Sequence, residues 1–290
     1  MFYSPLRYPG GKGKLAPFIE LLIDQSGHRG GTYIEPFAGG AGIAVELLQR
    51  GVVSQIVIND LDKGIYSFWR AILEETERFI YNVYNSPLDI EEWKKQRKIC
   101  FDQKQRYSFE LGFATFYMNR TNRSGIIKGG PIGGLEQSGD WKLDARFNRE
   151  VLAKRIENIA AQKGKIHVYN QDIGSFLCNY ALKYEKNAFI YFDPPYFDKG
   201  KQLYLNFFDY RDHLRIEKTI RETVKSDWVI TYDNVSPIAE IYRNYCIRRF
   251  ELNYSAYKKR RATEIMVFKR ENMIPSDEIL LKKDIQIKLA

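Results

Sequence analysis

The stretch TYIEPFAGGAGIAVELLQRG (residues 32–51) contains a short apolar run, a glycine-rich turn and an amphipathic segment. We expect a strand, a tight turn at FAGGAG (residues 37–42) and a helix that ends near Gly51, because glycine commonly follows a helix C-terminus. SQIVINDLD (residues 54–62) follows as a second apolar strand. A strand, a helix and a strand at this spacing predict a βαβ unit and hence a parallel α/β sheet.

This alternation of strands and helices is interrupted once along the chain. Residues 64–147 contain helical patterns and a glycine-rich, basic loop, NRSGIIKGGPIGGLEQSG, which we expect to be mobile. Strands and helices resume from residue 148, and FELNYSAY and TEIMVFKR form an expected antiparallel pair near the C-terminus. We therefore predict an α/β domain formed by residues 1–63 and 148–290, with a mostly helical insert at residues 64–147.

The composition is that of a soluble, basic protein. Of the 290 residues, 44% are hydrophobic and 28% charged, and the net charge of +9 favours an anionic partner such as nucleic acid. Three widely separated cysteines argue against a disulfide framework or a cysteine-based zinc site. The N-terminus lacks the apolar core of a signal peptide and no run approaches the length of a membrane span, so we expect a cytoplasmic protein.

Four acids stand where predicted strands end: Glu35, Asp60, Asp172 and Asp193. Ligands of open parallel sheets bind outside the carboxyl ends of the strands, and acids there can hold the hydroxyl and amino groups of an adenosine-like molecule. The alternative is that such acids cap the helices that follow them. Val45 occupies the place of the third glycine of a dinucleotide-binding pattern, which disfavours a nicotinamide cofactor.

The stretch FIYFDPPYFD (residues 189–198) places a carboxylate, two prolines and an aromatic ring after an apolar strand. Pro195 keeps Pro194 extended, and proline donates no hydrogen bond, so the Pro194 carbonyl stays available. The Asp193 carboxylate and this carbonyl can together accept both hydrogens of an aromatic amine, with the Tyr196 ring beside them. A structural turn with a packed tyrosine is the simpler alternative.

These motifs, in this order, resemble the Dam-like (D12 class, alpha group) N6-adenine-specific DNA methyltransferases. RYPGGKGKL (residues 7–15), EPFAGGAG, INDLD, the insert, FDPPY and RRATEIMVF, which contains Glu264, carry the resemblance along nearly the whole chain. It implies a Rossmann-like class I methyltransferase sheet with an inserted DNA target-recognition domain. It also implies direct methyl transfer from S-adenosylmethionine to N6 of a flipped adenine, without a metal ion. RYPGGK replaces the tryptophan-containing form common in GATC enzymes, so the DNA sequence recognised stays open.

The resemblance assigns roles to individual residues. The catalytic residues would be Asp193, Pro194, Pro195 and Tyr196. The methyl donor would contact Tyr8, Gly10, Lys12, Glu35, Pro36, Phe37, Ala38, Gly39, Gly40, Asp60, Asp172 and Asp193. DNA would contact Asn119, Arg120, Asn122, Arg123, Lys128, Lys259 and Arg260, although Ser124 stands where many relatives have asparagine.

Other functions remain open at this stage. The same acceptor pair would suit a cytosine-N4 methyltransferase, and an inert DNA-binding relative could keep the fold. We expect a monomer that acts on double-stranded DNA and contacts no membrane. A companion restriction enzyme is a further partner that the family suggests.

Overall fold

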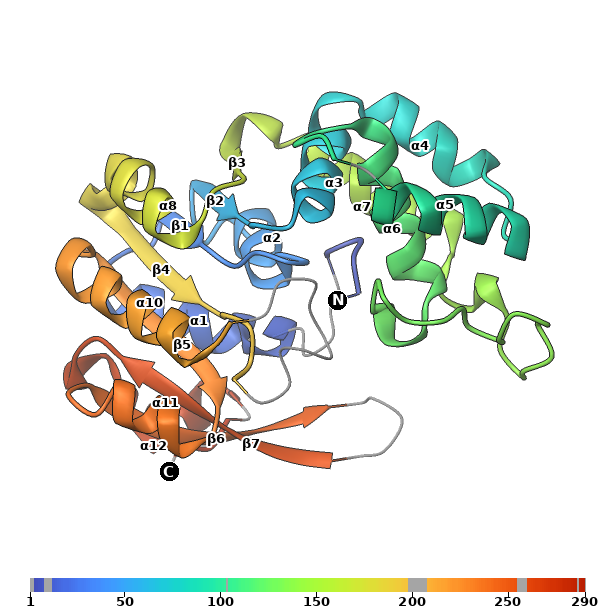
Figure 1. Cartoon of the computed structure of the whole chain (residues 1–290). Coiled ribbons are helices and arrows are strands. Elements are labelled where there is room, and N and C mark those ends of the chain that lie inside the picture. The colour runs from blue at the N-terminus through green and yellow to red at the C-terminus, as the bar shows by residue number, and fades with distance from the viewer. Residues whose placement is uncertain are drawn as a thin grey trace.

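The fold comes from a computed structural model that describes residues 3–7, 12–102, 104–197, 208–254, 260–285 and 287–289, with only the backbone for residues 252–254 and 260–262. A seven-stranded sheet with the order β3-β2-β1-β4-β5-β7-β6 crosses the molecule (Figure 1). The first five strands of that order are parallel, and β7 is antiparallel to both of its neighbours. The strands are β1 (Thr32–Glu35), β2 (Gln55–Asn59), β3 (Ile166–Tyr169), β4 (Ala188–Phe192), β5 (Asp227–Asp233), β6 (Cys246–Tyr254) and β7 (Arg260–Phe268).

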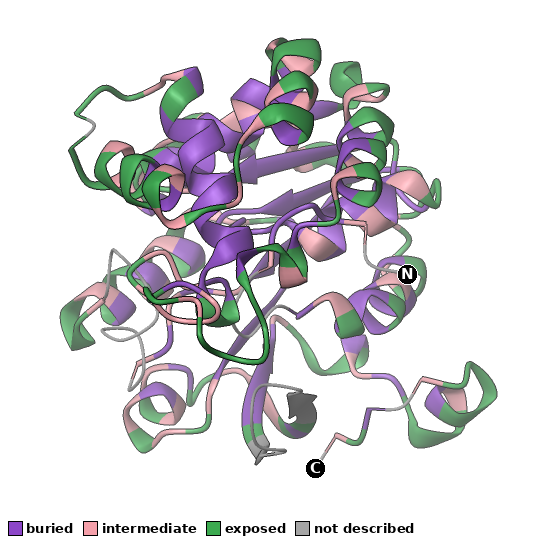
Figure 2. Cartoon of the chain, turned by 90° about the vertical axis from the view of Figure 1, so that its right-hand side faces the viewer, coloured by how far each residue is buried: buried purple, intermediate pink, exposed green. Residues whose placement is uncertain are grey.

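Two layers of helices cover the two faces of the sheet. Successive strand residues point to opposite faces, so each strand packs against both layers. Tyr33 of β1 packs in one apolar cluster, which includes residues of α1 (Ala16–Gln25) and α2 (Gly42–Gln49). The next residue, Ile34, packs in a second cluster. The helices that contribute to this second cluster are α8 (Ile173–Asn179), α10 (Tyr210–Thr223) and α11 (Ser236–Ile241). Burial on both faces explains why the middle residues of the central strands are apolar (Figure 2).

The chain between β2 and β3 forms a separate group of helices at one end of the sheet (Figure 1). They are α3 (Lys63–Glu74), α4 (Thr76–Asn85), α5 (Ile90–Asp102), α6 (Phe109–Thr121) and α7 (Arg149–Ala160). Gly112 lets α6 approach α3 closely, since a Cβ at this position would lie 2.5 Å from the Ser67 carbonyl oxygen. A Rossmann-like sheet interrupted by helices is thus confirmed, whereas the domain boundaries at residues 64 and 147 stay predictions.

The remaining short elements connect these layers. They are the 3₁₀ turns η1 (Lys12–Leu15), η2 (Arg123–Gly125), η3 (Leu143–Arg146), η4 (Lys163–Lys165), η5 (Ala181–Asn187) and η6 (Glu271–Met273), and the helix α12 (Asp277–Lys282). The loop expected to be mobile consists of hydrogen-bonded turns, because the Gln137 amide donates to the carbonyl oxygens of Ile132 and Gly134 at 2.7 and 2.6 Å. None of the helices in the described residues is long and apolar enough to cross a membrane.

Candidate active site

The predicted strand-end acids lie along the carboxyl edge of the sheet. Glu35 ends β1 and Asp193 follows β4, and these two strands are neighbours although they are far apart in the sequence. The strand order reverses between β1 and β4, which is the point where open α/β sheets bind ligands. Asp60 follows β2 on the other side of β1. Three of the predicted side chains therefore follow neighbouring strands around one edge.

The glycine turn after β1 is tied to the end of β2. Asp60 accepts a hydrogen bond from the Gly39 amide at 2.8 Å, and the Ala38 amide donates to the Asn59 carbonyl at 2.9 Å. Gly39 and Ala41 both have a positive φ, 45° and 42°, which brings the backbone round in a tight turn before α2. The turn is further held by Trp69, whose indole donates to the Gly39 carbonyl oxygen at 3.0 Å. The FAGGAG backbone is thus held by hydrogen bonds within the protein.

The acids beside this turn are poorly solvated. Glu35 is 5% exposed, and its Oε2 has no hydrogen-bond partner. Burial raises the pKa of Glu35 well above its usual range, and the nearby Asp193 carboxylate raises it further. Burial, together with the neighbouring Asp62, raises the pKa of Asp60 to about 7. This edge of the sheet therefore offers acceptors that would be stabilised by a ligand bringing hydroxyl, amino or cationic groups.

The carboxylate of Asp193 is held from the neighbouring strand. Its Oδ1 accepts a hydrogen bond from the Thr231 hydroxyl of β5 at 2.9 Å and lies 3.5 Å from the Lys12 ammonium. Burial raises the pKa of Asp193, whereas Lys12 lowers it. No described residue donates a hydrogen bond to the Pro194 carbonyl. The Phe197 amide donates to Asp233 at 3.0 Å, which anchors the end of this loop to β5.

Lys12 and Tyr196 meet a residue that strand-end reasoning did not assign to the site. The Lys12 ammonium is 2.6 Å from Glu264 Oε2 and 2.9 Å from the Tyr196 hydroxyl, and that hydroxyl donates to Glu264 Oε1 at 2.9 Å. All three residues are buried, with Glu264 only 3% exposed. Glu264 lies on the antiparallel strand β7 opposite Asp233. The network thus links the N-terminal RYPGGK motif, the DPPY loop and the hairpin motif.

The other residues predicted to contact the methyl donor lie in different environments. Asp172 is exposed and accepts a hydrogen bond from the Ser175 amide at 3.1 Å, so it caps α8, as the simpler alternative predicts. Hydrogen bonding by the Ser175 side chain, and to a smaller extent by its amide, lowers the pKa of Asp172. The Pro36 carbonyl oxygen accepts a hydrogen bond from the Asn59 side-chain amide at 3.1 Å, and Phe37 packs edge-on against Phe208. Gly40 accepts a hydrogen bond from the Ser4 hydroxyl at 2.5 Å. Tyr8 and Gly10 lie outside the described residues.

The predicted DNA-binding residues of the insert separate into two groups. Asn119 and Asn122 are buried, and their amides bond the backbone of Arg7 and of the 125–127 segment. These amide groups are therefore already hydrogen-bonded within the protein, and their contact with DNA stays a prediction. Arg120 is also buried and donates to the Pro5 carbonyl oxygen at 2.6 Å.

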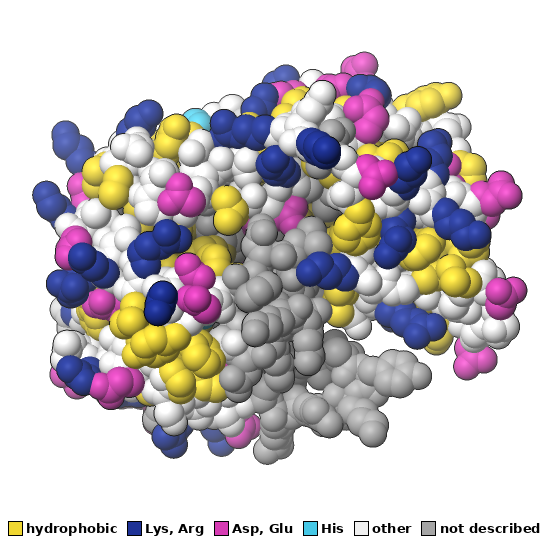
Figure 3. All heavy atoms as spheres, in the orientation of Figure 1, with side chains coloured by type: hydrophobic (Ala, Val, Ile, Leu, Met, Phe, Trp, Pro, Cys, Tyr) yellow, Lys and Arg dark blue, Asp and Glu magenta, His cyan; other side chains and the backbone are white. Residues whose placement is uncertain are grey.

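Arg123 and Lys128, by contrast, are exposed on the turns that follow α6. Lysine and arginine side chains are spread over both halves of the face seen in Figure 3, rather than gathered in one patch. Lys259 lies outside the described residues, and only the backbone of Arg260 is described. The contact of these residues with DNA therefore stays a prediction.

Several residues that position the site were not assigned by the sequence analysis. Asn59 joins the ends of β1, β2 and β3, since its amide donates to the carbonyl oxygens of Pro36 and Gln171, each at 3.1 Å. Thr231 and Asp233 on β5 hold the two ends of the DPPY loop. The signal for Asn59 was its place beside Asp60 at a strand end, whereas the pairing of β5 with β4 is a tertiary feature.

The sequence and structure of this chain are similar to those of known methyltransferases. Residues 8–261 match the family model of the D12 class N6 adenine-specific DNA methyltransferases. The Type II methyltransferase M.MjaIII of Methanocaldococcus jannaschii is 21% identical over 268 residues, which cover 84% of this chain and 89% of that protein. The rRNA methyltransferase AviRa of Streptomyces viridochromogenes is 12% identical in structural alignment, with a TM-score of 0.40, and the match covers 90% of this chain and 86% of that chain. The family match spans most of the sequence and includes every motif of the site from Lys12 to Asp193. This chain belongs to the D12 class N6 adenine-specific DNA methyltransferases.

Proposed function

We propose that this DNA adenine methyltransferase uses S-adenosylmethionine to methylate N6 of an adenine flipped out of duplex DNA, with Asp193 and the Pro194 carbonyl as acceptors for the amine. The observation that carries the proposal is the position of Asp193. Its carboxylate follows β4 directly beside β1, whose glycine turn and Glu35 border the same edge of the sheet. A donor above β1 and an amine above β4 would therefore be neighbours.

The residues around the glycine turn suit this donor. Glu35 has an unpartnered buried oxygen, and Asp60 stands at the end of the next strand, where it could accept hydrogen bonds from ribose hydroxyls. Among the described residues, Lys12 lies within ion-pair distance of two carboxylates, Asp193 and Glu264, and the further acids Glu35 and Asp60 stand at the same edge of the sheet. A cationic ligand would reduce this imbalance. When bound, S-adenosylmethionine supplies an electrophilic methyl group on a positively charged sulfur.

The residues around Asp193 suit an aromatic amine. The lone pair of such an amine is delocalised into the ring, so the nitrogen is a weak nucleophile. Hydrogen bonds from both of its hydrogens to Asp193 and to the Pro194 carbonyl would return electron density to nitrogen and orient it, which is electrostatic preorganisation. Asp193 need not remove a proton first, because the proton can leave after the nitrogen–carbon bond has formed.

The target base must leave the duplex to reach this site, at a cost of a few kcal/mol for unstacking and unpairing. The Tyr196 ring would stack on the flipped base, which requires an ordered ring. The ring is held by hydrogen bonds of its hydroxyl to Lys12 and Glu264, at 2.9 Å each. The relative from Methanocaldococcus jannaschii is named a Type II methyltransferase, which supports methylation of a fixed DNA sequence in partnership with a restriction enzyme.

The test is methyl transfer from labelled S-adenosylmethionine to duplex DNA by the Asp193→Ala variant, with Asp277→Ala as a control for loss of an exposed aspartate far from the site. We expect Asp277→Ala to retain activity and Asp193→Ala to lose at least a hundredfold, since it removes a hydrogen bond to a charged acceptor and the orientation of the amine. Near-wild-type incorporation by Asp193→Ala would contradict the assignment. Digestion of the product to nucleosides separates N6-methyladenine from N4-methylcytosine, the alternative that the same acceptor pair would permit.

A further inference from the structure

Four arginines gather where the N-terminal segment meets the insert. Arg7 lies in the segment, Arg120 on α6, Arg146 at the end of η3 and Arg155 on α7. Arg120 donates to the Pro5 carbonyl at 2.6 Å and Arg155 to the Ser4 carbonyl at 3.3 Å, so both side chains reach the same segment. The Arg7 amide and carbonyl are both bonded to the Asn119 side chain.

This arginine cluster lacks a compensating negative charge. Among the described residues, no aspartate or glutamate lies within ion-pair distance of any of the four side chains. The Nη1 atom of Arg7 is buried without a hydrogen-bond partner. Arg120 is 6% exposed, yet its neighbours in charge are other arginines. Buried cations are usually paired, so an unpaired cluster at this depth favours binding of an anion.

The pKa shifts of the cluster also favour binding of an anion. Burial, followed by the charges of Arg155, Arg7 and Arg146, lowers the pKa of Arg120 to about 9. Burial, followed by the charge of Arg146, lowers the pKa of Arg7 as well. An oxyanion among these guanidinium groups would relieve their mutual repulsion and accept their free N–H groups, for which arginine has the matching geometry.

We propose that Arg7, Arg120, Arg146 and Arg155 form a binding site for one backbone phosphate of the DNA substrate. The inference rests on the proposed DNA methyltransferase function and names a part of the DNA interface that lies outside the reaction site. The exposed Arg146 and the half-buried Arg155 would make first contact with the phosphate, and the buried Arg120 would add charge from below. Because the N-terminal segment contributes Arg7, the phosphate would join this segment to the insert.

Salt dependence of DNA binding tests the proposal. The affinity for a fluorescent 20-base-pair duplex is measured between 50 and 200 mM NaCl for wild type, Arg146→Gln and Arg155→Gln. Each lost phosphate contact should reduce the slope of log K against log salt by about 0.9, so that the affinity ratio across this range falls about 3.5-fold. Lys154→Gln is the matched control on α7, because Lys154 is 70% exposed and pairs with Glu157 at 3.2 Å. Its slope should equal that of wild type.

Two further measurements keep the outcomes separate. Arg155→Lys should retain the wild-type slope, because charge alone sets counterion release; a slope as low as that of Arg155→Gln would mean that the loss is structural and would overturn the proposal. Thermal unfolding in inorganic phosphate, against NaCl of equal ionic strength, should show a stabilisation of wild type that Arg146→Gln lacks. Stabilisation by phosphate with unchanged DNA slopes would indicate an adventitious ion only and would also overturn it.

The rate of methyl transfer distinguishes failure of the proposed function from failure of the phosphate site. At low salt and saturating DNA, the control variant Lys154→Gln should transfer methyl groups at the wild-type single-turnover rate, since Lys154 belongs neither to the reaction site nor to the arginine cluster. If wild type itself transfers no methyl group to DNA, the proposed function fails whatever the slopes are. If wild type is active and both arginine variants keep its slope, only the phosphate site is refuted.

Discussion

Opposite changes of charge around Asp193 should move the pH dependence of methyl transfer in opposite directions. Lys12 lies 3.5 Å from Asp193 and lowers the pKa of that carboxyl, whereas Glu264 raises it. At this distance a unit charge pair is worth about 5 kcal/mol at an effective dielectric constant of 20, and less because the Asp193 side chain is 25% exposed. The Lys12→Met variant should therefore have a higher Asp193 pKa, and Glu264→Gln a lower one.

The assay is the single-turnover rate of methyl transfer between pH 5.5 and 9 with saturating DNA and donor. Asp193 must be ionised to accept one amine hydrogen fully, while the Pro194 carbonyl accepts the other. For Lys12→Met we expect a rate about 10- to 100-fold below wild type at pH 7, which recovers as the pH rises, because a hydrogen bond to a charged group contributes about 1.5–3 kcal/mol. For Glu264→Gln the acid limb of the profile should move to lower pH. Limbs that move in the same direction, or do not move, would refute the role of the network.

Stability gives an independent measure of the same network. Lys12 and Glu264 have side chains only 2% and 4% exposed, and breaking a buried pair by removing one partner costs about 3–5 kcal/mol. The double variant Lys12→Met/Glu264→Gln should lose less free energy of unfolding in urea than the sum of the single variants, because neither charge is left unpaired. Lys14→Met, at an exposed position of the same 3₁₀ turn, is the control and should change stability little. Additive losses would mean that the two residues are not coupled.

Three further predictions concern the scaffold around the site. The pKa of Asp60 is raised to about 7, so its contribution to the free energy of unfolding is largest at acid pH and is lost as the pH rises through 7. Affinity for S-adenosylmethionine should increase over the same pH range. In Asp60→Asn, urea unfolding should no longer show the pH-dependent loss of stability, and calorimetry should no longer show the pH-dependent gain in donor affinity. Gly112→Ala should lower the free energy of unfolding by about 1–3 kcal/mol through its contact with the Ser67 carbonyl, while Gly164→Ala, with nothing within 4 Å, should not. Asn59→Ala should cost about 2–3 kcal/mol and weaken donor binding, since it frees the buried ends of three strands, and unchanged urea midpoints would contradict this.

Local sequence predicted the sheet edge well because parallel strands bring their carboxyl ends together. Glu35, Asp60 and Asp193 each follow an apolar run, and the β1–β4 pairing places them around one site. The sequence could not tell which of these acids would keep a carboxyl oxygen without a hydrogen-bond partner. Asp172 satisfies the amide of Ser175 at the start of α8, whereas Glu35 keeps an unpartnered oxygen. The difference depends on how far each strand end is covered by neighbouring elements.

The insert contains polar side chains of the family motif that are already bonded within the protein. Asn119 and Arg120 belong to a family motif, which suggested contacts with DNA, but every residue of α6 other than Glu110 is buried. A helix that is apolar along FATFYM is covered on all sides, and this pattern was the available signal that its polar residues would bond within the protein. The segment that covers Arg120 comes from residues 3–7, so no local pattern could reveal its partner.

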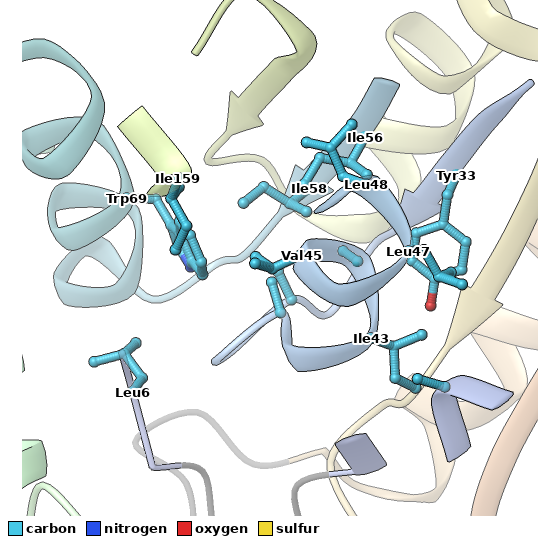
Figure 4. Packing of buried hydrophobic residues seen from close by; sticks show 14 of the residues in the cluster. Leu6, Tyr33, Ile43, Val45, Leu47, Leu48, Ile56, Ile58, Trp69 and Ile159 are labelled. Atoms are coloured by element: carbon cyan, nitrogen blue, oxygen red, sulfur yellow. The ribbon is translucent and has the colours of Figure 1, made fainter. Parts of the chain in front are cut away.

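The N-terminal segment connects the two ends of the proposed interface. Leu6 is buried in the same apolar cluster as Trp69 and Ile159, on α3 and α7 (Figure 4). Ser4 bonds the glycine turn through Gly40, and Lys12, which follows residues 3–7 by five positions in the sequence, lies 3.5 Å from Asp193. Displacement of this segment would therefore disturb the arginine cluster, the donor turn and the charge beside Asp193 together. It follows that DNA affinity, donor affinity and the pH dependence of transfer should fail jointly when the segment is loosened, whereas a change confined to Arg146 should affect the first alone.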